Sequence, residues 1–153
     1  ILFFPDEHLG RNTGNLKGIP RDEMKVWDRK EVQGGLSAEE IAKSKVLLWK
    51  GFCHVHTHFT VEHIQTIRET EPDAKVIVHR ECSEEVVALP DGCGSTEYIK
   101  RYVEAAVPGT TIYIGTELNH SVNLARLHGD KSEPVWAMPM IGLLPCNSPR
   151  VNP

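Results

Sequence analysis

Side chains that can bind a metal or move a proton gather in one short segment. It holds a cysteine and three histidines at alternating positions, Cys53, His54, His56 and His58. The segment follows an apolar run, residues 46–49, that is typical of a buried strand. In α/β sheets, ligands bind beyond the carboxyl end of a parallel strand, where the next helix begins. The segment therefore lies where α/β proteins carry out their chemistry.

The composition excludes several classes of protein. The chain has 153 residues, 40% of them hydrophobic and 25% charged, with a formal net charge of −4. Clustered basic charge, which nucleic-acid binding needs, is missing, and no apolar run approaches the roughly 20 residues that span a membrane. Four dispersed cysteines do not suit a disulfide scaffold and favour a reducing compartment. We expect a cytoplasmic protein without nucleic-acid or membrane partners.

Strand and helix patterns alternate along the chain. Strands are expected at residues 1–4, 46–50, 75–78 and 110–114. Helices are expected at about 37–44, 60–70, 83–89, 95–107 and 120–129. The glycine-marked segment 8–14 is expected to be a loop over the site, and residues 90–94 a turn. This alternation predicts an α/β fold, with a mostly parallel sheet and helices on its faces.

Two of the strands end in polar side chains. His79 and Glu81 follow the strand at 75–78, and Thr116 and Glu117 follow the strand at 110–114. Because the carboxyl ends of parallel strands share one edge of a sheet, we expect these residues to lie near Cys53. A His–Glu pair at that edge can relay a proton near neutral pH.

An anion could bind at the start of the helix at 95–107. Ser95 and Thr96 offer hydroxyl groups, free backbone N–H groups and the positive end of a helix dipole. Ordinary capping of the helix explains the same two residues without any ligand. The sequence leaves both interpretations open.

Ordered motifs along the chain resemble the quinolinate synthase family. They are Phe-Phe-Pro-Asp-Glu-His-Leu-Gly-Arg-Asn-Thr at 3–13, Val-Trp-Asp at 26–28, Trp-Lys-Gly-Phe-Cys-His-Val-His at 49–56, Val-His-x-Glu-Cys at 78–82, Gly-Ser-Thr at 94–96 and Ile-Gly-Thr-Glu at 114–117. The resemblance covers about residues 1–130 and continues more weakly around Cys146. Several motifs in one order are more specific than any of them alone.

This resemblance implies a transferase of de novo NAD biosynthesis. The family condenses iminoaspartate with dihydroxyacetone phosphate to quinolinate, and L-aspartate oxidase is the possible functional partner. Three similar three-layer αβα domains surround a 4Fe-4S cluster, and each domain supplies one cysteine. One iron without a protein ligand acts as a Lewis acid toward the substrate.

Residue by residue, the resemblance implies a set of site residues in this chain. Cys53 and Cys146 would be metal ligands of the cluster, with the third cluster cysteine outside this chain. His79 and Glu81 would be catalytic and would also bind substrate. Ser95 and Thr96 would bind substrate oxygens.

The resemblance also implies how the chain divides. Residues 1–52 would be part of the middle domain and residues 53–135 the third domain. Residues 136–153 would be a C-terminal tail that carries Cys146. The chain begins inside an apolar run and ends without a closing helix, so we expect a fragment of a longer protein.

Two local departures from the family pattern lie near the expected site. Arg80 stands where the family has a proline between the histidine and the glutamate, and Pro149 stands where it has a methionine after the last cysteine. A chain with two of the three cluster cysteines cannot complete the cluster by itself. A non-catalytic remnant of such an enzyme is therefore a further hypothesis.

Another alternative comes from the histidine spacing. His54 and His56, or His56 and His58, have the His-x-His spacing of metal-dependent amidohydrolases, in which alternate residues of an extended segment point the same way. The family pattern asks only for His56, which makes His54 and His58 surface histidines. Cys82 and Cys93 are expected not to bind metal, because Cys82 would pack beneath the loop of His79 and Cys93 would lie in a turn.

Overall fold

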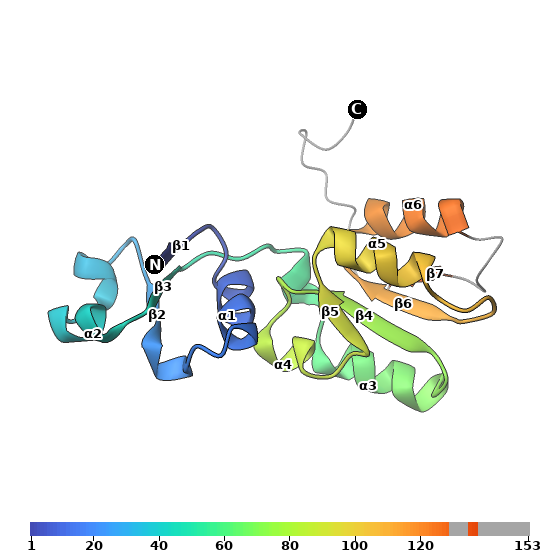
Figure 1. Ribbon diagram of the computed structural model, residues 1–153, viewed down its shortest axis with the longest axis horizontal. Helices are drawn as coiled ribbons and strands as arrows, with labels where there is room; N and C mark the ends of the chain where they lie inside the picture. Colours follow the sequence, from blue (N-terminus) through green and yellow to red (C-terminus); the bar gives the residue numbers. More distant parts are fainter. Residues whose placement is uncertain (129–134, 138–153) are drawn as a thin grey trace.

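The structure, a computed structural model, describes residues 1–128 and 135–137 and has the predicted α/β fold (Figure 1). The first sheet has the strand order β1-β3-β2, formed by Leu2–Phe3 (β1), Met24–Trp27 (β2) and Val46–Trp49 (β3). The second has the order β5-β4-β6-β7, formed by Lys75–His79 (β4), Gly92–Gly94 (β5), Ile112–Gly115 (β6) and Val135–Ala137 (β7). All paired strands among the described residues are parallel.

The second sheet is the middle layer of a three-layer αβα sandwich. Val76 and Val78 of β4 face the helices α3 (Val61–Thr70) and α4 (Glu84–Val87). Ile77, between them, faces the helices α5 (Thr96–Glu104) and α6 (Leu118–His128). Figure 1 shows the two helix pairs on opposite sides of the sheet. The alternation of side chains along a strand therefore builds two separate apolar cores on one sheet.

The first sheet has a smaller core, made by Met24, Val46 and Leu48. The helix α2 (Ala38–Lys43) begins with the predicted capping box, in which Ser37 and Glu40 exchange hydrogen bonds. Two short 3₁₀ turns, Arg21–Glu23 and Val32–Gly35, flank β2.

The prediction of a loop at residues 8–14 was wrong, because Glu7–Leu16 forms the helix α1. The Asp6 carboxylate starts this helix by accepting a hydrogen bond from the Leu9 N–H at 2.7 Å. Gly10 and Gly14 are buried, and a Cβ on Gly10 would lie 2.6 Å from Leu48 Cδ2. These glycines allow the helix to approach the sheet closely, so they serve packing instead of a turn.

The prediction of a turn at residues 90–94 was also wrong, because Gly92–Gly94 pairs with β4 as the edge strand β5. Its Gly-Cys-Gly sequence has almost no side chains to reveal a strand. The ring of Tyr98 lies against Gly94, where a Cβ would overlap it. The lack of a Cβ on Gly92 and Gly94 thus lets α5 pack closely onto β5.

The helix α1 joins the two sheets. The Asn12 side-chain amide donates hydrogen bonds to the carbonyl oxygens of Arg80 (2.8 Å) and Cys82 (2.9 Å), in the loop after β4. Asn15 donates to Glu84 at 2.9 Å, and Arg21 forms an ion pair with the same carboxylate.

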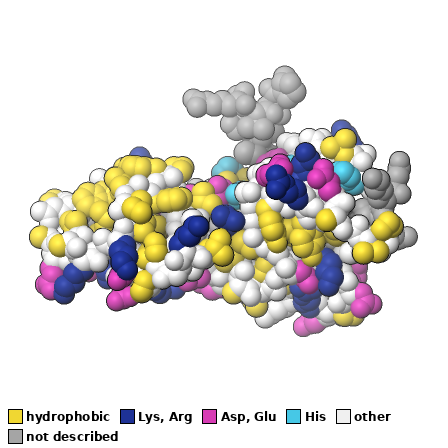
Figure 2. Space-filling model, viewed as in Figure 1, with side chains coloured by type: hydrophobic (Ala, Val, Ile, Leu, Met, Phe, Trp, Pro, Cys, Tyr) yellow, Lys and Arg dark blue, Asp and Glu magenta, His cyan; other side chains and the backbone are white. Residues whose placement is uncertain are grey.

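Figure 2 shows histidine side chains at the surface in the middle of the long axis, between the two sheets. Among the described residues, no helix has the length and apolar character to cross a membrane.

Candidate active site

The loops after β3 and β4 bring a thiol, an imidazole and a carboxylate together between the two sheets. One ligand atom each from Cys53, His56 and Glu81 lies within 4.8 Å of the other two. His56 is buried, whereas Cys53 and Glu81 are half-buried. The predicted neighbourhood of Cys53 and Glu81 is therefore observed, and His56 joins them. The expected reason was wrong, because β3 and β4 belong to different sheets and share no sheet edge.

Both nitrogens of the His56 ring face polar side chains. Nε2 lies 3.2 Å from Thr116 Oγ1, and Nδ1 lies 2.9 Å from a carboxylate oxygen of Glu81. Among the described residues, this buried Nδ1 has no hydrogen-bond partner, although it approaches the Glu81 carboxylate closely. The His79 ring stacks on His56 with a centroid distance of 4.5 Å. Only 6% of His56 is exposed, so these contacts fix the ring.

His79 is held in its neutral form. Burial, followed by the charge of His56, lowers the pKa of His79 to about 4. The backbone N–H of Glu81 approaches His79 Nδ1 at 3.3 Å, which makes Nδ1 the acceptor and places the ring proton on Nε2. At neutral pH, His79 can therefore donate one hydrogen bond from Nε2.

Glu81 carries the negative charge of the group. Its contact with His56 lowers the pKa of Glu81 most, burial opposes this, and His79 lowers the pKa further. The carboxylate is thus ionised near neutrality and can accept a proton or bind a cation. The Arg80 N–H donates to Gly94 O at 3.0 Å, which holds the backbone beside Glu81.

Asp6 fixes the position of Cys53, a role that was missing from the predicted site. Its second carboxylate oxygen accepts a hydrogen bond from the Cys53 N–H at 2.8 Å, while the first caps α1. Only 4% of Asp6 is exposed. A capping aspartate can be recognised in the sequence before Glu7, but its bond to a cysteine 47 positions later cannot.

Comparison with known proteins identifies the family to which this site belongs. Residues 1–148 match the family model described as "Quinolinate synthetase A protein". The chain belongs to this family. It is 50% identical over 131 residues to a quinolinate synthase of Bacillus velezensis and 51% identical over 133 residues to one of Geobacillus kaustophilus. Both alignments cover 86% of this chain and 35% of the relative, so the chain spans about a third of the length of these relatives.

Two residues expected after β6 have different surroundings in this member of the quinolinate synthase family. Thr116 is 5% exposed and contacts His56, which makes it part of the site. Glu117 caps α6 instead, accepting hydrogen bonds from the backbone N–H groups of Asn119 at 2.9 Å and His120 at 3.1 Å. Capping of α6 therefore explains a glutamate at position 117 without a role in the site.

Ser95 and Thr96 are exposed at the start of α5. Ser95 accepts a hydrogen bond from the Tyr98 N–H at 3.3 Å, so it is the helix cap that the sequence allowed. Gly94 pairs with His79 in the sheet, which places Ser95 at the same sheet edge as the site. The role of both residues in binding quinolinate synthase substrates stays a prediction.

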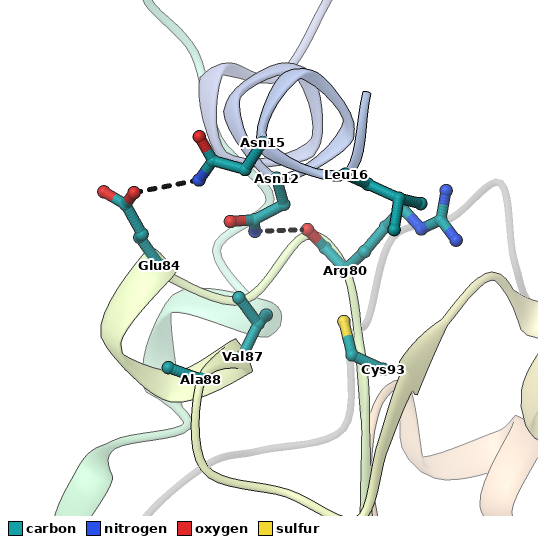
Figure 3. Close-up of a pocket in the computed structure, with 8 residues that line it drawn as sticks. All are labelled: Asn12, Asn15, Leu16, Arg80, Glu84, Val87, Ala88 and Cys93. Carbon is teal, nitrogen blue, oxygen red and sulfur yellow. Dashed lines mark hydrogen bonds between the residues drawn. The ribbon is translucent and has the colours of Figure 1, made fainter. Parts of the chain in front are cut away.

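The other cysteines of the described residues differ from Cys53. Cys82 is fully buried, its thiol donates to Gly115 O at 3.9 Å, and burial raises its pKa strongly. Burial also raises the pKa of Cys93, which lines a cavity of about 380 Å³ between α1 and α4, together with Asn12, Arg80 and others (Figure 3). Cys82 thus packs as predicted. Cys146 lies outside the described residues.

The geometry contradicts the His-x-His alternative. His56–His58 forms a 3₁₀ turn, so alternate residues do not point the same way. His56 is buried, whereas His54 and His58 are exposed, as the family pattern predicted. A pair of histidines cannot bind one metal ion from this segment in the way an amidohydrolase requires.

Proposed function

We propose that this chain forms part of a quinolinate synthase, which condenses iminoaspartate with dihydroxyacetone phosphate to quinolinate. The observation that carries this proposal is the convergence of Cys53, His56 and Glu81 from two strand ends, in a chain of this family. NAD biosynthesis in the cytoplasm, with L-aspartate oxidase as the source of iminoaspartate, is part of the same proposal.

A 4Fe-4S cluster fits the donor that Cys53 offers. Its thiol is half-buried, and its backbone N–H is held by Asp6, so a soft ligand is presented to the site from a fixed backbone. We propose Cys53 and Cys146 as cluster ligands, with a third thiolate from outside this chain. Cys82 does not fit, because its buried thiol resists ionisation. When bound, the cluster supplies an open iron that polarises a substrate oxygen.

His79 and Glu81 are the proposed proton-handling residues. His79 donates a hydrogen bond from Nε2 to a substrate oxygen, because its Nδ1 is occupied by the Glu81 N–H. The Glu81 carboxylate accepts a proton from the substrate and passes it on when the product leaves. His56, stacked on His79 and held by Thr116, keeps the His79 ring in place.

Ser95 and Thr96 are the proposed substrate-binding residues. The Ser95 oxygen already accepts the Tyr98 N–H, which leaves its O–H free to donate to a carboxylate or phosphate oxygen. The start of α5 adds favourable dipole charge for such an anion. In the whole enzyme, we propose that residues 1–52 belong to the middle domain, residues 53–135 to the third, and residues 136–153 to a C-terminal tail.

Anaerobic reconstitution tests the cluster. The chain would be incubated with iron and sulfide, and iron, sulfide and zinc would be counted per chain. Binding of iron and sulfide that is lost in a Cys53→Ala variant would support the proposal. A folded chain that binds no iron or sulfide, even with a small thiol present to supply the third thiolate, would favour the non-catalytic remnant.

A chimaera tests the reaction. This chain would replace the matching third of the Geobacillus kaustophilus quinolinate synthase, and quinolinate formation would be measured. We expect activity that falls by about 10²–10⁴-fold in Glu81→Gln and His79→Asn variants. His58→Gln, an exposed histidine of the same segment, is the control and should retain activity. A chimaera with a full cluster and no quinolinate would contradict the proposal.

A further inference from the structure

The described residues alone provide three kinds of metal-binding atom at one place. They are the sulfur of Cys53, a ring nitrogen of His56 and a carboxylate oxygen of Glu81. We propose that, when no cluster is present, they bind a single divalent ion of the zinc class, with a fourth position open to water. This inference goes beyond the proposed function, because it needs neither Cys146 nor a thiolate from outside the chain.

The spacing of the donors suits one ion. Sulfur, nitrogen and oxygen ligands lie about 2.0–2.3 Å from zinc, so ligands of one tetrahedral ion lie about 3–4 Å apart. The three donor atoms already lie within 4.8 Å of one another without an ion. Rotation of the half-buried Cys53 and Glu81 side chains would close the remaining distance.

The His56 ring has the arrangement of a metal ligand. Its Nε2 faces the Thr116 hydroxyl at 3.2 Å, and its buried Nδ1 has no hydrogen-bond partner in the part of the chain that the structure describes, although it faces Glu81. Metal-binding histidines typically donate their other ring N–H to a fixed acceptor, which orients the ring. Thr116 can act as that acceptor, which leaves the lone pair of Nδ1 directed at the ion.

The backbone on both sides of the site is fixed before any ion binds. Asp6 holds the Cys53 N–H, and Asn12 holds the carbonyl oxygens on either side of Glu81. An ion therefore meets a site that is largely preorganised, and a thiolate and a carboxylate balance its two positive charges.

The single ion and the cluster compete for one thiolate. Both need Cys53, but only the single ion needs His56 and Glu81 as ligands. An ion of the zinc class bound here would consequently keep a cluster from assembling at Cys53. Zinc added before iron and sulfide should reduce the iron later bound per chain.

The test uses Co²⁺ as a spectroscopic probe. The chain, reduced, stripped of metal by a chelator and kept anaerobic, would be titrated with Co²⁺ and then with Zn²⁺. We expect one Co²⁺ per chain, a thiolate-to-cobalt charge-transfer band, the intense visible bands of a tetrahedral ion, and displacement by Zn²⁺.

Five variants separate the ligands from their neighbours. Cys53→Ser should abolish the charge-transfer band, and His56→Gln and Glu81→Gln should each weaken binding by about a hundredfold. His58→Gln and Cys93→Ser are the controls, because they remove an imidazole and a thiol that are not proposed ligands. Both variants should bind Co²⁺ as tightly as the unchanged chain does. Circular dichroism checks that each variant folds. Should His56→Gln fail to fold, Thr116→Val replaces it and should weaken binding without removing a ligand.

Three results would overturn the inference. They are a folded chain that binds no Co²⁺, Co²⁺ binding without a thiolate band, and unchanged affinity in the Glu81→Gln variant. Reconstitution with iron and sulfide on the same variants keeps the two proposals apart. A cluster that survives Glu81→Gln while Co²⁺ binding is lost would support both, and Co²⁺ binding without any cluster would contradict only the cluster.

Discussion

The two sheets of this chain differ in how completely they are covered. The second carries helices on both faces and has two apolar cores, whereas the first has one core of three buried residues. Both contribute to the site, because Cys53 and His56 follow β3 and the other members follow β4 and β6. The site is thus built between a well-packed half and a thinly packed one, and the hydrogen bonds of α1 connect them.

The largest expected effect compares the cores directly. Ile77 and Leu48 are both fully buried. Replacement by alanine costs about 2–5 kcal/mol, depending on how far the surroundings collapse. We expect Ile77→Ala, in the sheet that helices cover on both faces, to fall at the upper end and Leu48→Ala at the lower end, measured by urea unfolding. An equal or larger cost for Leu48→Ala would show that the first sheet is better packed than its small core indicates.

The second prediction concerns the close approach of α1 to the first sheet. Alanine normally stabilises a helix by about 1 kcal/mol relative to glycine. At Gly10, however, a Cβ would lie 2.6 Å from Leu48 Cδ2 and 2.7 Å from Phe3 Cδ1. We expect Gly10→Ala to destabilise the chain by about 1–3 kcal/mol. The exposed Leu16 is the control, and Leu16→Ala should change thermal stability little.

The third prediction concerns the connection between the halves. Asn12 donates to two backbone carbonyl groups beside the site, whereas Asn15, on the same helix, donates to an exposed carboxylate. Loss of a donor to part-buried backbone groups costs about 1–3 kcal/mol. Asn12→Ala should therefore destabilise the chain and increase alkylation of Cys53, whereas Asn15→Ala should change neither. Equal behaviour of the two variants would contradict the bracing role of α1.

The smallest expected effect concerns two carboxylates, one in each half. Burial raises the pKa of Asp91, but the Val76 N–H and Arg68 lower it more, so the net pKa lies below 3.8. The Lys50 side chain and the Lys30 N–H lower the pKa of Asp28, a half-buried carboxylate whose partner Lys50 is exposed.

Stability that comes from a lowered carboxyl pKa is complete above the ordinary value and is lost as the pH falls below it. Asp91→Asn should accordingly destabilise the chain at pH 7 and flatten the acid limb of the stability curve. Asp28→Asn should do so less, because the side chain of its partner Lys50 is 56% exposed and solvent screens their contact. Urea unfolding at several pH values measures both, and a steeper acid limb in Asp91→Asn would contradict the sign.

The sequence predicted the elements whose residues carry their own signals. The capping box at Ser37, the β-branched run of β4 and the apolar stripe of α3 depend on local patterns, and the structure has all three. The helix α1 and the strand β5 were missed because their glycines are needed for close packing against other elements, not for a turn. Local patterns cannot distinguish such glycines from those of a turn.

The site was predicted less completely than the fold. The family pattern pointed to His56 among three histidines, but its contact with Thr116 lies 60 positions along the chain and became visible only in the structure. Glu117 followed a strand as site residues do, and it proved to be a helix cap. The catalytic and ligand roles of Cys53, His79, Glu81, Ser95 and Thr96 stay predictions.

The Asp6 carboxylate has a kinetic consequence. Because one oxygen holds the first turn of α1 and the other holds the Cys53 N–H, fraying of that helix end also releases the cysteine backbone. The amide hydrogens of Leu9 and Cys53 should then exchange with solvent through one shared opening event. The rate at which the site loosens would be set by a helix terminus that lies outside the site itself.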